Sequence, residues 1–262
     1  MIKVEELSFT YPDGTRALYD ITTSIEPGSF QALLGQNGSG KSTFAKCLSG
    51  ILDPSEGTIT VNGTDRGSIP QTELARKIGY VFQNPDHQLF TSTVRDDIAS
   101  GPRNLGLDRD TVEERLHEAA EIAGVDEELF DQHPFFLTKG LRQRVAIASV
   151  LAMRPDTIIV DEPTTGQDHR QSIEVMEFLS SLNQKHDHTI LIITHDIYIV
   201  AHYAEELILF NEGKKHYEGS VRDAFGQPEL LQEANVTPPQ ITKYMRKANG
   251  QTCLTVEEAL DY

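Results

Sequence analysis

The sequence predicts an α/β protein that combines a mixed, mainly parallel sheet with an N-terminal antiparallel β subdomain and an inserted helical subdomain. Two short apolar runs, Thr157–Asp161 and Thr189–Thr194, indicate the parallel part, because they flank a helical segment at about 170–184. Such runs are typical of strands buried on both faces, and strand–helix–strand order is typical of crossover connections. The first 35 residues alternate short β-branched runs with turn signals, which predicts the strands of the N-terminal subdomain.

The predicted elements follow in order from the N-terminus. A turn is expected at Tyr11–Gly14 and a helix from Lys41 to about Gly50. The strands expected around them lie at 2–4, 7–10, 17–25, 30–34, 57–62 and 78–82.

The middle of the chain changes character between about 84 and 152. It becomes helical, and residues 101–136 hold ten acidic and three basic side chains. Asp110–Glu113 resembles a capping box that starts a helix, and Gly124 is its stop signal. Farther on, a hairpin is expected over 205–219 with its turn at Asn211–Gly213. The expected organisation is therefore a domain over 1–220 with a helical subdomain inserted at about 84–152, followed by a helical appendix over 221–262.

Composition and charge exclude several classes of protein. The 262 residues include 23 Lys and Arg and 40 Asp and Glu, which gives a net charge of −17 and opposes nucleic-acid binding as the main role. The longest nearly apolar stretch, Val145–Met153, is too short for a membrane span, which needs about 18 residues. No secretory signal is visible, and two cysteines cannot form a disulfide framework. These features predict a cytoplasmic protein, in the first instance a soluble enzyme.

The segment Gly35–Ser42 matches the pattern Gly-x4-Gly-Lys-Ser/Thr, between the strand at 30–34 and a helix. Glycines allow backbone N–H groups to converge on phosphate oxygens, and the helix N-terminus adds a positive dipole. Lys41 is placed to reach the β- and γ-phosphates, and the Ser42 hydroxyl is a ligand for Mg²⁺. The alternative is a glycine-rich turn with a chance match, but the strand and the helix on the correct sides favour a nucleotide site.

Two further polar groups follow predicted buried strands. Asp161 ends the run at 157–161, where a carboxylate is suited to bind Mg²⁺, and Glu162 is placed to polarise an attacking water. His195 follows the run ending at Thr194, at a strand end where it would lie near bound phosphates. Alone, the Asp-Glu pair would be interpreted as a solvated turn and the histidine as a solvated loop residue.

In combination, these motifs resemble the ATP-binding subunit of an ABC transporter over at least residues 1–220, built on a P-loop NTPase core. The chain is most similar to the energy-coupling factor type, which serves cobalt, nickel or vitamin uptake, because of the runs Gln83–Phe90 and Gly101–Gly106. The matching motifs, in chain order, are the phosphate loop Gly35–Thr43, the Q-loop glutamine Gln83, the signature Leu137–Gln143, the Walker B segment Ile158–Thr164, the D-loop Thr165–Asp168 and the histidine motif Thr194–Asp196.

The resemblance implies a role for each matching residue. Catalysis would involve Glu162, His195, Lys41 and Gln83, and Mg²⁺ would be bound by Ser42, Gln83 and Asp161. Tyr11 would stack on adenine, although it could instead pack beneath the neighbouring turn. The residues implied in ATP binding are Tyr11, Gly35, Gln36, Asn37, Gly38, Ser39, Gly40, Lys41, Ser42, Thr43, Thr138, Lys139 and Gly140.

At the signature, the chain departs from the usual Leu-Ser-Gly-Gly-Gln. Thr138 keeps a hydroxyl and Gly140 keeps the second glycine, whereas Lys139 replaces the first glycine and Leu141 replaces the glutamine. Lysine adds a cation but also bulk where the backbone should approach phosphate. We therefore hypothesise that a site completed by this signature binds or hydrolyses ATP less well than one with the standard motif.

The implied function is an ATP-hydrolysing subunit that forms a homodimer or heterodimer around two ATP molecules and powers an importer. Its partners would be a transmembrane coupling subunit and a substrate-binding membrane subunit, which places it at the cytoplasmic face of the cell membrane. Leu89, Phe90, Val94 and Ile98 could line a groove for the coupling subunit or belong to the core of the helical subdomain. The alternatives are an ABC-type ATPase that acts on nucleic acid or ribosomes, which the charge opposes, and a weakly hydrolysing regulatory subunit.

Overall fold

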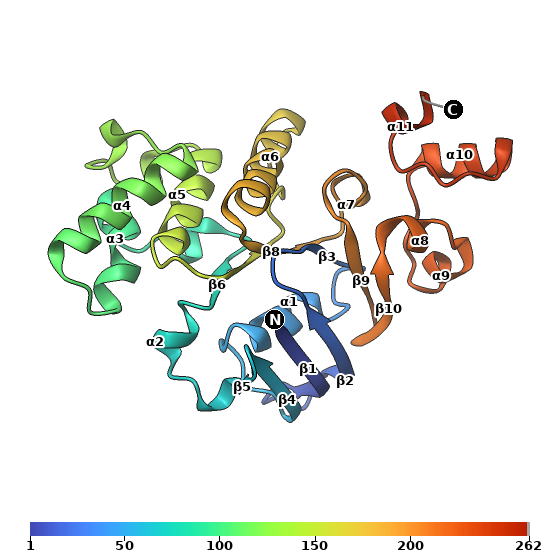
Figure 1. The fold of residues 1–262 in the computed structure, drawn as a ribbon, viewed down its shortest axis with the longest axis horizontal. Helices are drawn as coiled ribbons and strands as arrows, with labels where there is room; N and C mark the ends of the chain where they lie inside the picture. Colours follow the sequence, from blue (N-terminus) through green and yellow to red (C-terminus); the bar gives the residue numbers. More distant parts are fainter. Residues whose placement is uncertain (261–262) are drawn as a thin grey trace. The chain divides into compact units, whose positions relative to one another are not determined.

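A computed structural model of the protein describes residues 1–260 (Figure 1). Backbone contacts divide the chain into two compact units, of which the first comprises Met1–Arg66 and the part from Thr189 onward. The second unit is Gly67–His188. The sequence predicted different limits, with an insertion at about 84–152 and an appendix at 221–262. These limits stay predictions. The last two residues of that appendix lie outside the described part.

The first unit contains an antiparallel sheet in the order β2-β1-β4-β5. Sequence analysis expected two strands at 2–4 and 7–10, but the structure has one strand with a register shift between Val4 and Leu7. Glu6, which lies in this shift, has a left-handed backbone with φ 52°. A bulge of this kind interrupts the period of two and so divides one strand into two in the sequence pattern. The strands are β1 (Ile2–Thr10), β2 (Arg16–Ile25), β4 (Glu56–Val61) and β5 (Thr64–Asp65).

The same unit contains the parallel strands expected from the apolar runs. Strand β3 (Phe30–Leu34) lies between β8 (Thr189–Thr194) and β9 (Glu206–Asn211) and is parallel to both. Every residue of β3 and β8 is buried, which explains why both are mostly apolar. The antiparallel strand β10 (Lys214–Ser220) completes the predicted hairpin. Helices α1 (Lys41–Leu48) and α7 (Ile197–Tyr203) follow β3 and β8.

Four short helices follow β10. They are α8 (Val221–Phe225), α9 (Pro228–Glu233), α10 (Gln240–Asn249) and α11 (Val256–Leu260). Arg222 joins the first of them to the last, because its guanidinium donates to the Thr252 carbonyl at 2.7 Å and pairs with Glu258. Phe225, Leu231 and Cys253 are fully buried, so these helices have an apolar interior.

The second unit contains the parallel strands β6 (Ile78–Val81) and β7 (Thr157–Asp161). Its helices α3 (Val94–Asn104), α4 (Arg109–Ala123) and α5 (Lys139–Leu151) pack on one another (Figure 1). A short helix, α2 (Gln71–Leu74), precedes β6, and α6 (His169–His186) follows β7. No helix among residues 1–260 combines the length and apolar character that crossing a membrane requires.

Helix α4 corrects one detail of the sequence analysis. The helix begins at Arg109, and its N-cap is Asp108, whose carboxylate accepts the Thr111 N–H at 3.0 Å. The capping box expected at Asp110–Glu113 is therefore wrong, because Asp110 already lies in the first turn of the helix and Asp108 is its cap. The stop at Gly124 is confirmed, since this residue caps the helix with φ 65°.

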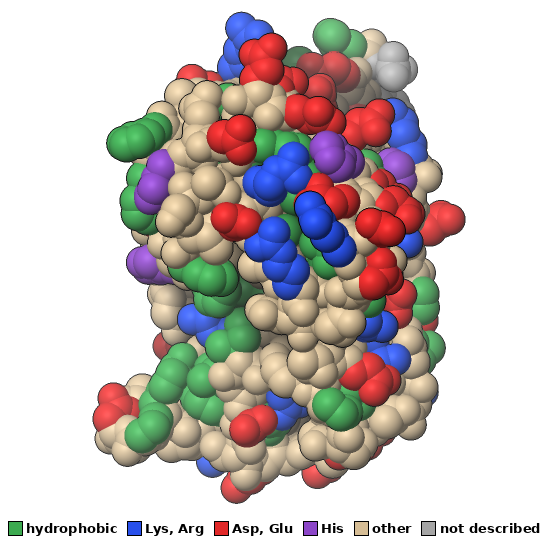
Figure 2. Space-filling view, turned by 90° about the vertical axis from the view of Figure 1, so that its left-hand side faces the viewer, with side chains coloured by type: hydrophobic (Ala, Val, Ile, Leu, Met, Phe, Trp, Pro, Cys, Tyr) green, Lys and Arg blue, Asp and Glu red, His purple; other side chains and the backbone are tan. Residues whose placement is uncertain are grey.

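The acidic character of the helical segment is partly balanced by arginines. On the face in Figure 2, Lys and Arg side chains gather near the middle and are bordered by Asp and Glu side chains. Arg95 pairs with Glu113 at 2.5 Å, and Arg154 pairs with Glu118 at 2.5 Å. These contacts join α3 and the segment after α5 to α4. They are half-exposed, so each contributes at most about 1 kcal/mol.

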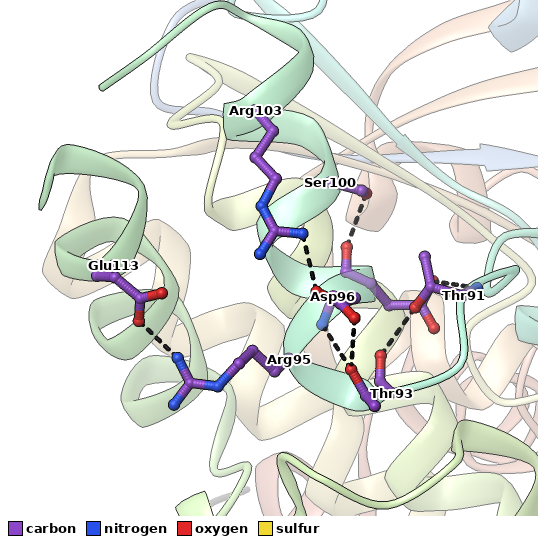
Figure 3. Close-up of polar contacts among 8 residues, drawn as sticks. Thr91, Thr93, Arg95, Asp96, Ser100, Arg103 and Glu113 are labelled. Atoms are coloured by element: carbon purple, nitrogen blue, oxygen red, sulfur yellow. Dashed lines mark hydrogen bonds and ion pairs between the residues drawn. The ribbon is translucent and has the colours of Figure 1, made fainter. Parts of the chain in front are cut away.

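The segment before α3 is positioned by Asp97. Its carboxylate is 1 % exposed, and Oδ1 accepts the N–H groups of Phe90 and Thr91 at 3.0 and 3.1 Å. Neighbouring Thr93 and Asp96 cap the start of α3 (Figure 3). Burial raises the pKa of the Asp97 carboxyl above its ordinary value of 3.8. The folded state therefore pays a desolvation cost to keep this anion as an acceptor for two backbone groups.

We expect Asp97→Ala to lower the free energy of unfolding by about 1–3 kcal/mol, because two N–H groups lose their acceptor. Folding raises the pKa of Asp97, so one part of its contribution to stability is linked to ionisation. This part is complete below pH 3.8 and is lost as pH rises through the folded-state pKa. The difference between wild type and variant should therefore grow as pH falls from 7 toward 3.8, which urea unfolding at several pH values measures.

Asp108→Ala is the matched control for this pH trend. Hydrogen bonds from Thr111 lower the pKa of the Asp108 carboxyl in the folded state, so its contribution is present above 3.8 and is lost as pH falls. The effects of the two substitutions should change in opposite directions with pH. Parallel changes would contradict the role assigned to Asp97.

Candidate functional site

The phosphate loop, Gly35–Thr43, leaves β3 and ends in the first turn of α1. Gly35 and Gly40 have φ values of 155° and 102°, which favour glycine. A Cβ atom at Gly35 would lie 2.4 Å from the carbonyl oxygen of Phe210, and one at Gly40 would lie 2.9 Å from that of Ala17. Both positions therefore accept only glycine, because backbone atoms of neighbouring strands or loops fill the space.

The loop has the chemistry of a phosphate site. Gly40 caps α1 without a side-chain hydrogen bond, so the helix N-terminus keeps N–H groups for an anion. Lys41 is 5 % exposed, and its ammonium donates to the carbonyl oxygens of Gly35 and Gln36 at 2.8 Å each. Ser39 Oγ is buried and has no hydrogen-bond partner among the described residues. These groups fit the phosphates of ATP, which would supply acceptors for both side chains.

Two other predicted residues lie close to this loop in the first unit. Leu34 and Thr194 are partners in the parallel strands β3 and β8, so Gly35 and His195 follow neighbouring strands at the same edge. His195 is exposed there. The Tyr11 hydroxyl forms a 2.9 Å hydrogen bond with Thr43 Oγ1, and its ring contacts Phe9 edge-on at 4.9 Å. The structure thus brings both the tyrosine and the histidine to the phosphate loop.

The second unit brings together the other predicted catalytic residues. Val81 and Val160 are partners in the parallel strands β6 and β7, so the segments with Gln83 and with Asp161 and Glu162 leave the same edge. Asp161 is buried and its Oδ2 accepts a hydrogen bond from the Tyr80 hydroxyl at 2.8 Å. Glu162 is 8 % exposed and has a left-handed backbone with φ 49°. Such a conformation is uncommon outside glycine and is found where function fixes a side chain.

Glu162 and the signature are linked through Thr165. The Thr165 hydroxyl donates to Glu162 Oε2 at 3.2 Å, and the Lys139 ammonium donates to the Thr165 carbonyl at 2.6 Å. The cation of the variant signature is therefore held by the D-loop of its own chain. The hypothesis that this signature slows hydrolysis stays a prediction.

The remaining signature residues form the start of α5. Thr138 is the N-cap, and its hydroxyl accepts the Leu141 N–H at 3.4 Å. Gly140 has open space around its Cα, so the helix N-terminus is accessible. An accessible helix N-terminus is suited to a phosphate group.

The structure adds a residue that sequence reasoning missed. Gln88 accepts the Phe82 N–H through Oε1 at 3.2 Å, and its Nε2 donates to the Ala146 carbonyl at 2.8 Å. These bonds hold the segment that contains Gln83 against α5. No sequence pattern identifies such a glutamine, because its α5 partner Ala146 lies 58 residues away in the chain. In contrast, Gln83 itself is exposed.

The donors proposed for Mg²⁺ have the correct chemistry. Hydroxyl, carboxylate and amide oxygens are hard ligands of the kind that Mg²⁺ prefers, and Mg²⁺ usually shares its site with substrate phosphates. Gln83 and Asp161 belong to the second unit, and Ser42 belongs to the first. The residue types therefore fit the ion.

The sequence left open whether four residues line a groove for a partner or belong to the core, and the structure decides this for three of them. Leu89, Val94 and Ile98 are buried in the second unit, so they are core residues. Phe90 is 76 % exposed, and Phe136 is 85 % exposed. Two large aromatic side chains on one unit are therefore available to a partner.

Comparison with known sequences gives consistent matches. The model of the ABC transporter family matches residues 18–165, more than half of the chain. An energy-coupling factor transporter ATP-binding protein of Caldanaerobacter subterraneus subsp. tengcongensis is 40 % identical over 100 % of this chain and 96 % of its own length. A protein of that name from Bacillus subtilis is 38 % identical over 93 % of this chain and 92 % of its own.

One relative is longer. A protein of the same Caldanaerobacter strain, assigned as an ABC transporter ATP-binding protein, is 44 % identical over 98 % of this chain. The chain covers 45 % of that relative, which is less than half its length.

Solved structures agree with this result. CbiO1 of Clostridium perfringens, part of the ABC transporter complex CbiONQ, matches with a TM-score of 0.78 and 38 % identity over 94 % of this chain and 98 % of that one. A dimeric ATP-binding cassette in a post-hydrolysis state bound to ADP and Pi matches with a TM-score of 0.75 and 28 % identity, over 85 % and 99 % of the two chains.

Proposed function

Because this chain belongs to the ABC transporter family, and within it to the energy-coupling factor transporter ATP-binding proteins, we propose that it hydrolyses ATP to power an importer of that type. The observation that carries this proposal is the phosphate loop, whose glycine backbone, buried lysine and uncapped helix N-terminus suit the phosphates of a nucleotide.

ATP binding begins with an exchange of partners at Lys41. Its ammonium donates to the Gly35 and Gln36 carbonyls, and the β- and γ-phosphates replace these acceptors. A charge-assisted bond to phosphate is stronger than a bond to a neutral carbonyl, so the exchange is favourable. Tyr11, whose hydroxyl is bonded to Thr43, presents its ring to adenine.

Hydrolysis depends on Glu162 and His195. Glu162 accepts a proton from the attacking water as the water oxygen adds to the γ-phosphorus and the bond to the bridging oxygen of the leaving ADP breaks. The hydrogen bond from Thr165 orients the Glu162 carboxylate. His195 donates a hydrogen bond to the γ-phosphate from the strand end beside the phosphate loop. Ser42, Asp161 and Gln83 are the residues that would hold Mg²⁺, which would supply positive charge to the phosphates.

Assembly supplies the remaining contacts. The relatives support a second ATP-binding subunit, identical or different, whose signature faces the phosphate loop of this chain. A transmembrane coupling subunit would contact the exposed Phe90 and Phe136, which places the protein at the cytoplasmic face of the membrane. The transported substrate, whether cobalt, nickel or a vitamin, is chosen by a separate membrane subunit.

The test of this proposal is ATP hydrolysis by the purified chain with Mg²⁺, alone and after co-expression with its membrane subunits. We expect wild type to release phosphate and Lys41→Ala to lose both activity and nucleotide binding, because the phosphates lose their buried cation. Removal of Mg²⁺ by a chelator should abolish hydrolysis.

Lys46→Ala, which removes an α1 lysine outside the nucleotide contacts, is the control and should keep its activity. Hydrolysis by Lys41→Ala at the wild-type rate would contradict the proposed site. Activity of the isolated chain without any membrane subunit that co-purifies would instead favour an ATPase not coupled to transport.

A further inference from the structure

A cavity lies in the first unit, between the phosphate loop and the C-terminal helices. Its volume is about 690 Å³. Gln36 contributes from the phosphate loop, and all other lining residues come from α8, α9, α10 and their connections. Small-molecule sites commonly have volumes of about 300–1,000 Å³, so the cavity has the size of one.

The charge of this lining differs from that of the chain as a whole. Lys243, Arg246 and Lys247 recur on one face of α10, and no Asp or Glu lines the cavity, although the sequence has 40 of them. Within residues 1–260, none of the three cations has an ion pair or a side-chain hydrogen bond. Elsewhere in the same unit, cations such as Arg222 and Lys215 are paired with glutamates. The C-terminal end of the helix dipole favours Arg246 and Lys247 in the last turn, but like charges three or four residues apart still repel, so an anion is a suitable partner for the cluster.

The cavity also contains apolar surface. Pro228 and Pro238 line it without being buried, and the buried Phe225 and Val236 complete the apolar lining. Three cations next to an apolar surface fit a ligand that joins a multivalent anion to an apolar group. This is the chemistry of an organic phosphate.

The cavity is connected to the phosphate loop by one side chain. Gln36 Nε2 donates to the Asn235 carbonyl at 3.2 Å, and the Gln36 carbonyl accepts the Lys41 ammonium at 2.8 Å. Asn211 Nδ2 donates to the Glu233 carbonyl at 3.0 Å and holds the same connection from β9. A ligand that stabilises this arrangement also stabilises the hydrogen bond that the Lys41 ammonium donates to the Gln36 carbonyl, which ATP must break.

We propose that this cavity is an effector site that binds a small organic phosphate and weakens ATP binding through Gln36. The site shares Gln36 with the phosphate loop, is otherwise lined by residues outside it, and goes beyond the proposed function. Because coupling between two sites is reciprocal, ATP should weaken the effector by the same factor.

The probe for the test is phenyl phosphate, titrated calorimetrically into the full chain. The cavity variant is Lys243→Gln with Arg246→Gln, and the charge-matched control is Lys3→Gln with Lys185→Gln, two exposed lysines outside the cavity. We expect one site whose affinity falls at least tenfold in the cavity variant and stays unchanged in the control. Binding should persist in Lys41→Ala, and wild type saturated with probe should bind ATP at least threefold more weakly.

Several results would overturn the proposal. Loss of probe binding in Lys41→Ala, with retention in the cavity variant, would assign the probe to the phosphate loop. Equal affinity in the cavity and control variants would assign it to general surface charge. An unchanged ATP affinity at saturating probe would remove the effector role. A change of molecular mass in the cavity variant without a change of probe affinity would assign the cations to contact with a second copy.

Two further controls separate a loss of probe binding from misfolding and from a failure of ATP hydrolysis. Lys247→Gln alone should give an intermediate loss of probe affinity, and thermal unfolding should show that each variant is folded. The probe binds without hydrolysis, so failure of the ATPase assay leaves this test intact.

Discussion

Glu162→Gln is expected to lower ATP hydrolysis by about 10²–10⁴-fold, the usual contribution of a general base, while ATP still binds. Glutamine has nearly the same shape and still accepts the Thr165 hydroxyl bond, but it cannot take a proton from water. The phosphate loop is unchanged, so nucleotide binding should remain. Single-turnover hydrolysis and equilibrium ATP binding measure the two effects separately.

The control for this prediction is Glu177→Gln, which removes the same charge from an exposed position on α6. Thr165→Ala should have a smaller effect than Glu162→Gln, because it removes the orienting hydrogen bond and leaves the carboxylate. Equal rates for wild type and Glu162→Gln would assign the base to another residue. Loss of ATP binding in Glu162→Gln would show that the residue acts in binding and not in proton transfer.

Gly35→Ala is expected to abolish ATP binding and to lower the free energy of unfolding by about 2–5 kcal/mol. The added Cβ would lie 2.4 Å from the Phe210 carbonyl oxygen and 2.8 Å from Ser39 Oγ. Phe210 is fully buried in β9, which is paired with β3, so its backbone cannot move aside easily. Urea unfolding and ATP titration provide the two measurements.

Gly38→Ala is the matched control within the same loop. Its φ of 81° also favours glycine, but its Cβ would meet nothing within 4 Å. We therefore expect only the backbone cost of about 1–2 kcal/mol. If both substitutions destabilise the chain equally, the collision with Phe210 is not what requires glycine at position 35.

Much of the fold could be predicted from the sequence because its strands have strong local signals. The apolar runs at Phe30–Leu34, Thr157–Asp161 and Thr189–Thr194 are strands with those same limits. Boundaries were less predictable where a tertiary contact competes with the local pattern. Asp108 rather than Asp110 caps α4, and the shift at Glu6 interrupts β1.

The candidate site was predictable where one segment contains all of its chemistry. The phosphate loop has its glycines, lysine and helix start within nine residues, so the pattern implies the geometry. The hydrogen bonds made by Gln88 and Thr165 could not be predicted in this way. Each acts through a hydrogen bond to a residue that it meets only in the folded chain, Ala146 for Gln88 and Lys139 for Thr165.

The sequence by itself determined the family, the positions of the main strands along the chain and the residues of the phosphate loop. These depend on local spacing and on periodic burial. Only the tertiary structure decided where the unusual cations act. The Lys139 ammonium contacts the Thr165 carbonyl, and the cations of α10 line a cavity beside Gln36. Long side chains are flexible and residues far apart in the chain meet only on folding, so the direction of a charge is set by packing.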